Sequence, residues 1–267
     1  MSNDDQLKVR QTVSKKKSFK ELTIVRDIIF WIDLVGEGQN ENAIFARPFN
    51  EKEAFPQKLT SKKYNIKNNF HGYGGKSYKC IYFKNNFYLI WIDQITNAVW
   101  FQIFKEVASN YRSQKRYLDS VQEPRQLSKS IDGNFDSSFV ISQKNFLYGI
   151  CEINNRDYLF SLNLKKTKQD IYRIKKFKNF AGELSSNTSV SLLSWVEWDS
   201  PYMPWEKNDL CFAQIDLDGE ITKIKKFSDK LINAKKNVSF FQPYWISETL
   251  LVCSEDSSGW WNLLFLD

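Results

Sequence analysis

The sequence predicts an all-β protein, and three observations support that prediction. Short runs rich in Ile, Val, Phe, Tyr and Trp recur along the 267 residues, and most are five to ten residues long, as strands are. Turn-forming sequences separate neighbouring runs, and no long segment has the periodicity of an amphipathic helix. Aromatic residues make up 16% of the chain, whereas Gly and Pro are few, which excludes collagen-like and low-complexity classes.

The expected strands follow one another closely enough to be joined by hairpins. Asn-rich sequences at 84–86 and 154–157 and an Asp-Gly pair at 218–219 have the composition of hairpin turns. Residues 109–136 are polar and contain Pro124, so they are expected to form a long connection. The expected strands are residues 28–32, 43–46, 78–83, 87–92, 98–104, 138–142, 146–151, 158–162, 189–198, 210–215, 249–254 and 260–266.

These strands group with a period of about 40 to 50 residues, which is the length of a propeller blade. The segments lie near residues 22–60, 78–128, 135–180, 188–230 and 240 onward. The fold class is therefore predicted to be a β-propeller built from antiparallel meanders, with a β-sandwich as the alternative. We expect it to be incomplete, with four to five blades, because the last run stops at Asp267 in mid-blade.

The net charge of +7 and the pI of about 9.0 suggest a nucleic-acid partner, but the charge distribution argues against one. Six of the basic residues and two acidic residues lie in positions 1–20, which leaves only +3 for the remaining chain. We expect residues 1–20 to form a basic flexible arm and residues 21–267 a partial β-propeller domain. Nucleic-acid binding through residues 8–20 is kept as a third alternative, although the chain has only 8 Arg against 30 Lys.

Cysteine and histidine usage excludes several kinds of site. The four cysteines, Cys80, Cys151, Cys211 and Cys253, are far apart and sit in apolar runs, so buried free thiols in a reducing compartment are expected. The N-terminal residues are polar and show neither a secretory segment nor a membrane span, so the cytoplasm is predicted. His71 is the only histidine, which excludes His-based metal sites, and no metal or other cofactor is expected.

Four segments, in order, resemble the N-terminal propeller of the prolyl oligopeptidase family, in the branch of dipeptidyl aminopeptidases and acylaminoacyl peptidases. The resemblance spans most of the chain from about residue 20. The segments are Arg47-Pro48 with Leu59-Thr60 and His71-Gly72-Tyr73-Gly74-Gly75; Trp198-Asp199-Ser200-Pro201-Tyr202-Met203-Pro204-Trp205; Gln242-Pro243-Tyr244-Trp245; and Ser258-Gly259-Trp260-Trp261-Asn262-Leu263.

This resemblance implies structural or domain-contact roles for the positions that match the family. Gly72, Ser200 and Tyr202 depart from the family's usual Glu, His and Asn, which puts contacts by those polar groups in doubt. The matching positions are His71, Tyr73, Gly74, Gly75, Trp198, Asp199, Pro201, Met203, Pro204, Trp205, Gln242, Pro243, Trp245, Gly259, Trp260, Trp261 and Asn262.

Members of this family are serine peptidases that pair the propeller with an α/β-hydrolase domain, and the propeller limits access to peptides. This chain has no Gly-x-Ser-x-Gly elbow. Ser77 comes nearest, because it follows Gly75 by two residues, but it lacks the second glycine, so no catalytic residue is expected. The resemblance therefore implies a propeller that gates peptide access to a hydrolase domain missing from this chain. A stand-alone propeller-like module that binds a protein partner is the alternative.

Three expectations concern individual motif residues. His71 is expected to make hydrogen bonds within a Gly-rich turn rather than to act as a base. Gly72, Gly74 and Gly75 should form a tight turn between blades, since no helix follows to present its amide ends to a phosphate. Trp260 and Trp261 should point to opposite faces of a strand and pack in the core.

Overall fold

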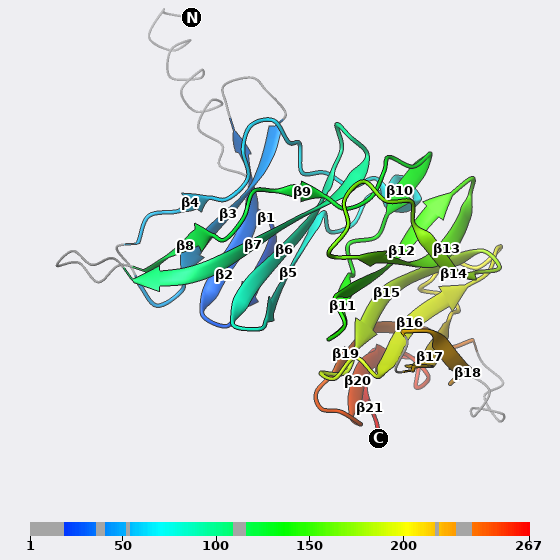
Figure 1. Ribbon diagram of the computed structural model, residues 1–267. Helices are drawn as coiled ribbons and strands as arrows, with labels where there is room; N and C mark the ends of the chain where they lie inside the picture. The colour runs from blue at the N-terminus through cyan, green and yellow to red at the C-terminus, as the bar shows by residue number, and fades with distance from the viewer. Residues whose placement is uncertain (1–18, 36–40, 52–53, 109–115, 217–218, 228–236) are drawn as a thin grey trace, which may run out of the picture.

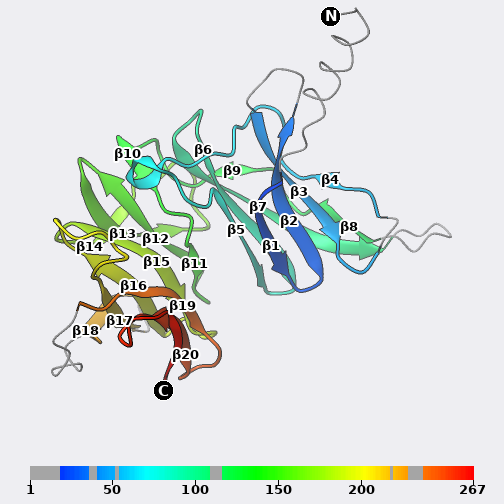
Figure 2. The ribbon, with the colours of Figure 1, turned by 180° about the vertical axis from the view of Figure 1, so that it is seen from behind.

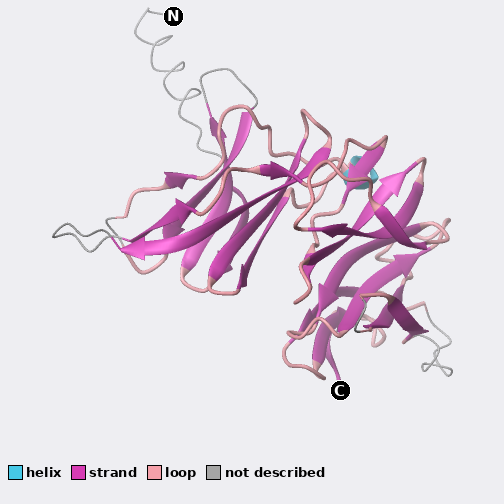
Figure 3. Cartoon of the chain, in the orientation of Figure 1, coloured by secondary structure: helices cyan, strands magenta, loops and turns pink. Residues whose placement is uncertain are grey.

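The structure, a computed structural model, describes residues 19–35, 41–51, 54–108, 116–216, 219–227 and 237–267. Within these ranges the chain forms five antiparallel sheets and no α-helix, and η1 (Phe70–Gly72) is a single turn of 3₁₀ helix (Figure 3). The sheets follow one another in chain order along an arc, with the first sheet and the fifth sheet at opposite ends (Figures 1 and 2). The all-β prediction is confirmed.

Each sheet is an up-and-down meander. The first sheet holds β1 (Lys20–Val25), β2 (Ile28–Val35), β3 (Glu41–Pro48) and β4 (Gln57–Lys58). The second sheet holds β5 (Tyr78–Phe83), β6 (Asn86–Asp93), β7 (Ala98–Ala108) and β8 (Arg116–Ser120), with β9 (Arg125–Gln126) also paired to β7. The third sheet holds β10 (Gly133–Phe135), β12 (Phe146–Ile153), β13 (Arg156–Asn163) and β14 (Tyr172–Lys176), with β11 (Val140–Ile141) paired to β12.

The fourth sheet holds β15 (Phe180–Ser186), β16 (Leu192–Trp198), β17 (Asp209–Ile215) and β18 (Ile221–Lys226). The fifth sheet has three strands, β19 (Phe240–Trp245), β20 (Leu251–Glu255) and β21 (Asn262–Leu266). These five sheets match the five segments that the sequence period indicated, except that the fourth sheet begins earlier, at β15, than the expected residue 188. The sequence period therefore locates the blades.

Hairpin turns form where the sequence indicated them. Lys84 and Asn85 join β5 to β6 with φ of 48° and 60°, and Asn154 and Asn155 join β12 to β13 with φ of 52° and 56°. Two successive left-handed residues match the twist of the flanking strands, and asparagine tolerates this conformation well. Of the expected turn at 218–219, Asp218 lies outside the described residues.

The expected long connection at 109–136 is wrong, because residues 116–120 form β8 at the outer edge of the second sheet. The Gln57 side chain accepts from the backbone N–H of Leu118 at 2.9 Å and donates to its carbonyl at 2.6 Å. Leu118 is the one buried side chain of this strand. An edge strand with a single inward-facing residue leaves too weak an apolar pattern to be recognised from sequence.

Apolar side chains fill the space between each pair of consecutive sheets, which gives four cores for five sheets. Alternation along the strands sends successive side chains to opposite faces, so each inner sheet contributes to two cores. Representative fully buried pairs, from the first interface to the fourth, are Phe30 and Trp91, Phe101 and Phe160, Tyr148 and Trp195, and Leu210 and Phe240. This stacking of sheets face to face is the architecture of a propeller.

The outer faces of the two end sheets remain exposed. On β1 the side chains of Leu22 and Ile24 are 58% and 51% exposed, and that of Phe19, just before β1, is 63% exposed. On β21 the side chains of Leu263 and Phe265 are 67% and 57% exposed. We call the exposed outer face of the first sheet the first end face and that of the fifth sheet the fifth end face. Nothing in the described chain covers them, and the expected arm lies mainly in residues 1–18, outside the described residues.

All four cysteines are buried free thiols, as the sequence indicated. Burial raises the pKa of each thiol, and that of Cys253 reaches about 12. We expect a disulfide-exchange reagent to react negligibly with the native chain and to titrate four thiols after denaturation without reductant, because only a thiolate attacks efficiently. Fewer than four thiols after denaturation would contradict the prediction.

Candidate functional site

Three of the four motif segments lie at one end of the sheets. In an antiparallel meander the second strand ends where the first begins, so residues 67–77 before β5, 199–208 after β16 and 256–261 after β20 share that end. Contacts between the segments agree with this placement, since the His71 ring lies 5.4 Å from that of Trp198. We call this the motif end of the propeller.

His71 anchors the Gly-rich turn to the third sheet. It has a φ of 52° within η1, and its backbone N–H donates to Glu152 Oε2 at 3.2 Å. Its Nε2 lies 2.8 Å from Asp157 Oδ2, and the two side chains are 6% and 0% exposed. The hydrogen-bonding role expected for His71 is confirmed, and the turn joins the first sheet to the second as expected.

Asp157 connects three elements through one oxygen. Oδ2 also accepts from the backbone N–H of Ala181 at 2.7 Å, so η1, β13 and β15 meet at this carboxylate. Burial raises the pKa of Asp157, although its bonds with His71 and Ala181 oppose the rise. The His71 ring also packs edge-on against Phe180 and Trp198. This pair therefore has the geometry of a structural fixing point rather than of a nucleophile and its base.

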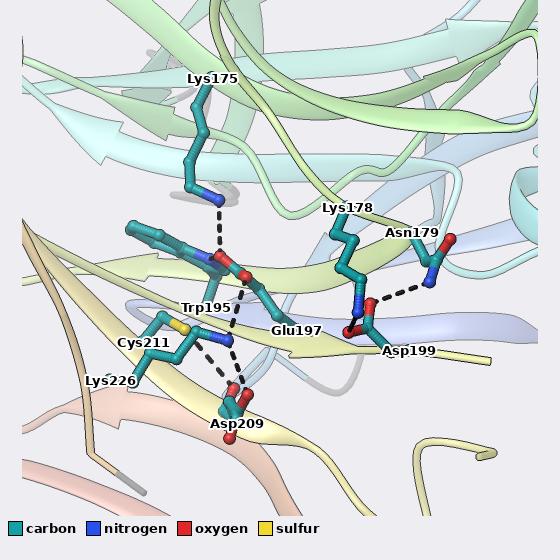
Figure 4. A network of polar contacts seen from close by, with 9 residues as sticks. All are labelled: Lys175, Lys178, Asn179, Trp195, Glu197, Asp199, Asp209, Cys211 and Lys226. Atoms are coloured by element: carbon teal, nitrogen blue, oxygen red, sulfur yellow. Dashed lines mark hydrogen bonds and ion pairs between the residues drawn. The ribbon is translucent and has the colours of Figure 1, made fainter. Parts of the chain in front are cut away.

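The second motif forms a loop held at its base and exposed at its tip. Asp199 accepts from Lys178 Nζ at 2.7 Å and from Asn179 Nδ2 at 2.9 Å (Figure 4). Burial raises its pKa, but these two donors outweigh burial, and the pKa of Asp199 is lowered overall. The peptide bond before Pro201 is cis. Beyond this anchor, Met203 is 37% exposed and Trp205 is 56% exposed.

A second polar network lies beside this anchor and stiffens the fourth sheet (Figure 4). Glu197 accepts from Lys175 Nζ and from the Trp195 indole, each at 2.8 Å. Lys226 pairs with Asp209 at 2.7 Å and with Glu197 at 3.8 Å. The network joins β14, β16, β17 and β18, so it fixes the strands from which the Trp198 to Trp205 loop leaves.

The third motif lies inside the propeller on β19. Gln242 has a φ of 55°, and its backbone N–H donates to Glu183 Oε2 at 2.5 Å. The Trp245 indole donates to Ser194 Oγ at 3.0 Å. These bonds attach the fifth sheet to the fourth, and they leave the side chain of Gln242 exposed to the interior.

The expectation for the two tryptophans of the fourth motif is wrong. The strand β21 begins at Asn262, so Trp260 and Trp261 lie in the preceding turn and are 80% and 51% exposed. Asn262 Nδ2 holds this turn by donating to Ser258 Oγ at 2.7 Å and to the Trp260 carbonyl at 2.9 Å. Trp261 contacts Phe241 at 5.3 Å between ring centroids.

A cavity of about 830 Å³ connects the motif end with the interior. Eight of the seventeen motif positions line it: His71, Tyr73, Gly74, Gly75, Trp198, Pro204, Gln242 and Pro243. The remaining nine, which do not line it, are Asp199, Pro201, Met203, Trp205, Trp245, Gly259, Trp260, Trp261 and Asn262. Four further residues bring charge to the cavity: Lys76, Lys79, Asp136 and Glu183.

Two carboxylates that join the inner strands lie outside the sequence motifs. Glu21 of β1 accepts from the Ser77 backbone N–H at 2.5 Å and from its hydroxyl at 2.8 Å, which links the first two sheets. Glu183 of β15 makes the corresponding link to Gln242. Glu21 and Glu183 occupy bulges with φ of 52° and 58°. Such bulges leave no clear sequence signal, because glutamate does not favour the left-handed conformation.

Enclosure in the cavity raises the pKa of Glu183 to about 7, while the Gln242 N–H opposes the rise. The folded chain therefore favours the neutral acid, and this stabilisation is lost as pH rises from about 4.5 to about 7. We expect Glu183→Gln, which imitates the neutral form, to unfold like the parent at pH 4. At pH 8 it should be more stable, by on the order of 1–3 kcal/mol, in urea melts.

The matched control for this prediction is Glu123→Gln, because Glu123 is an exposed carboxylate outside the cavity. Its stability difference from the parent should not change between pH 4 and pH 8. A parallel pH response of the two variants would contradict the role assigned to Glu183.

The described residues contain no group of three or more His, Cys, Asp or Glu side chains arranged to hold a metal ion. Nor does any helix in those ranges have the length and apolar character needed to cross a membrane.

Known proteins of similar fold are found among solved structures but not from the sequence alone. No protein-family model matches the sequence, and no curated protein matches it. Solved structures do match: a puromycin hydrolase at a TM-score of 0.74 and 17% identity, and a puromycin-hydrolyzing peptidase of Mycobacterium tuberculosis at 0.73 and 16%. Prolyl oligopeptidase B of Galerina marginata matches at a TM-score of 0.50 and 10% identity.

The chain has the fold of an incomplete β-propeller, and this propeller resembles those of the prolyl oligopeptidase family of serine peptidases. The two puromycin-hydrolysing structures each cover 95% of this chain, but the chain spans only 38% of each of them. The resemblance indicated by the four motifs is thereby confirmed at the level of fold.

Proposed function

We propose that this chain is the non-catalytic propeller part of a prolyl-oligopeptidase-like serine peptidase, in the dipeptidyl aminopeptidase and acylaminoacyl peptidase branch. In this role it limits which peptides reach an α/β-hydrolase domain docked at the motif end. One observation carries the proposal: the cavity is bordered by motif residues at that end and extends between the inner strands. A peptide moving through it would pass the charged and aromatic side chains that line it.

The chemistry of the motif end supports domain docking. Exposed aromatic and thioether side chains gather on the loops there, while their backbones are held by buried or charge-assisted bonds. Exposed apolar clusters on rigid loops are typical of interaction surfaces. The side chains are Tyr73, Tyr202, Met203, Trp205, Trp260 and Trp261.

The test is association with a hydrolase domain. The DNA that follows codon 267 should encode, in this frame or a shifted one, a segment with Gly-x-Ser-x-Gly. Expressed separately, that segment should bind the chain, and the complex should cleave short peptides but not folded proteins. Met203→Ala with Trp205→Ala should weaken the complex, whereas Tyr172→Ala with Ile246→Ala, which changes exposed side chains at the opposite end of the sheets, should not.

The second candidate function is a stand-alone module that binds a protein partner, which the same exposed aromatic loops favour. Absence of a hydrolase segment after codon 267 would reject the peptidase proposal and select this alternative. We place either form in the cytoplasm, because four buried cysteines without a disulfide suit a reducing compartment.

We expect the 267-residue chain itself to show no peptidase or esterase activity. Acyl transfer needs an activated nucleophile together with a base and oxyanion donors. Ser77, the serine closest to an elbow in sequence, is buried and donates its hydroxyl to Glu21. A fluorophosphonate probe should therefore label no serine, and labelling at any serine would contradict this prediction.

A further inference from the structure

Two lysines face the cavity without a partner. Lys76 and Lys79 both line it, and neither ammonium group makes a hydrogen bond or an ion pair with the described residues. Of the lysines outside the cavity, Lys175 and Lys178 are paired with carboxylates at 2.8 Å and 2.7 Å, whereas Lys165 and Lys176 are exposed to solvent. The cavity lysines thus present several N–H donors with no protein acceptor.

The carboxylates of the cavity already have donors of their own. Asp136 accepts from the Ser138 hydroxyl and, at 3.2 Å, from the Ser138 backbone N–H. Glu183 accepts from the Gln242 N–H. Enclosure lowers the pKa of Lys79, and the neighbouring charge of Lys76 lowers it further, although Asp136 opposes both. Both lysines keep accessible surface, and two neighbouring like charges are stabilised by an added anion.

The rest of the lining suits a peptide. Aromatic side chains border the cavity from the Gly-rich turn, from β16 and from β19, and its volume lies in the range of about 300–1,000 Å³ typical of ligand sites. The aromatic residues are Phe70, Tyr73, Trp198, Phe241 and Tyr244. Such a surface accepts apolar side chains, while the lysines require oxygen acceptors.

We propose that Lys76 and Lys79 together bind a carboxylate of a peptide inside the propeller, so that the chain selects acidic peptides. The inference rests on the proposed function, because it names the class of peptide that the cavity admits. Carboxylates are the matching acceptors, since charge-assisted bonds to ammonium groups are stronger than bonds between neutral groups.

The first experiment measures binding of fluorescein-labelled peptides to the 267-residue chain by anisotropy. The peptides are Gly-Glu-Phe-Glu-Gly and its Gln and Lys counterparts. We expect the Glu peptide to bind about tenfold more tightly than the Gln peptide, and the Lys peptide least tightly. Lys76→Gln with Lys79→Gln should remove the preference, and Lys76→Arg with Lys79→Arg should keep it. The control, Lys165→Gln with Lys176→Gln, removes two exposed lysines outside the cavity and should also keep it.

A second measurement does not depend on variants or on the oligomeric state. Brief acylation with an amine-reactive ester, followed by mass spectrometry, should show Lys76 and Lys79 protected by the Glu peptide but not by the Gln peptide. Lys165 and Lys176 should react equally in both mixtures. Equal binding of the Glu and Gln peptides, or no selective protection, would overturn the inference. Binding of the hydrolase domain is measured separately, so a failure of acidic-peptide selection would leave the proposed function standing.

Discussion

The isolated chain is expected to self-associate and to increase the fluorescence of 8-anilinonaphthalene sulfonate strongly. The cause is the pair of end faces, where Leu22 and Ile24 at one end and Leu263 and Phe265 at the other are each more than half exposed. Contiguous apolar surfaces of this kind promote association. Contacts between a fifth end face and the first end face of another copy are heterologous, so they form open chains of molecules rather than closed dimers.

Charge substitutions distinguish association through the end faces from nonspecific hydrophobic association. Leu263→Lys with Phe265→Lys should shift the chain toward monomer in size-exclusion chromatography and reduce dye binding several-fold. Ile95→Lys with Tyr172→Lys, which adds the same charge at exposed apolar positions away from the end faces, should leave both unchanged. A monodisperse parent chain that does not bind the dye and melts sharply would contradict the prediction and favour the stand-alone module.

Covering the fifth end face with a partner should reverse the association. If further blades and a hydrolase domain are added, they should cover the fifth end face, and the product should be monomeric with a cooperative melt. This outcome follows from the proposed function, because a propeller protects its sheets by packing each one against a neighbour.

The sequence predicts the blades well because each one repeats the same local chemistry. Apolar strands that alternate with Asn-rich turns specify a meander without reference to the rest of the chain, as at Asn154 and Asn155. Edge strands such as β8 are not recognised, since only Leu118 is buried there. Burial supplies most of the pattern on which such predictions depend.

The site is less predictable because its parts come from different blades. The motifs identified eight residues that line the cavity, but they did not indicate Asp157, Glu183 or the pair of Lys76 and Lys79. Each of these acquires its role from a partner that is distant in sequence, as His71 and Asp157 show with a separation of 86 residues. The exposure of Trp260 and Trp261 likewise depends on where β21 begins, a boundary that local composition leaves open.

The largest stability loss is expected from His71→Ala. The substitution removes a ring packed against Phe180 and Trp198, and it deprives the fully buried Asp157 carboxylate of its side-chain hydrogen-bond partner. Breaking a buried pair in this way costs about 3–5 kcal/mol. For a chain of this size that corresponds to a fall in Tm of roughly 10 °C, measurable by circular dichroism.

Two further variants test whether the His71 and Asp157 pair is the cause of that loss. Tyr73→Ala alters an aromatic residue of the same turn that is 71% exposed, and it should change stability by less than about 0.5 kcal/mol. In an Asp157→Asn background, His71→Ala should cost at least about 1 kcal/mol less than in the parent, because a neutral amide leaves no buried charge without a partner when the ring is removed. If the cost is equal in both backgrounds, the ring's packing and not its bond to Asp157 holds the motif end to the third sheet.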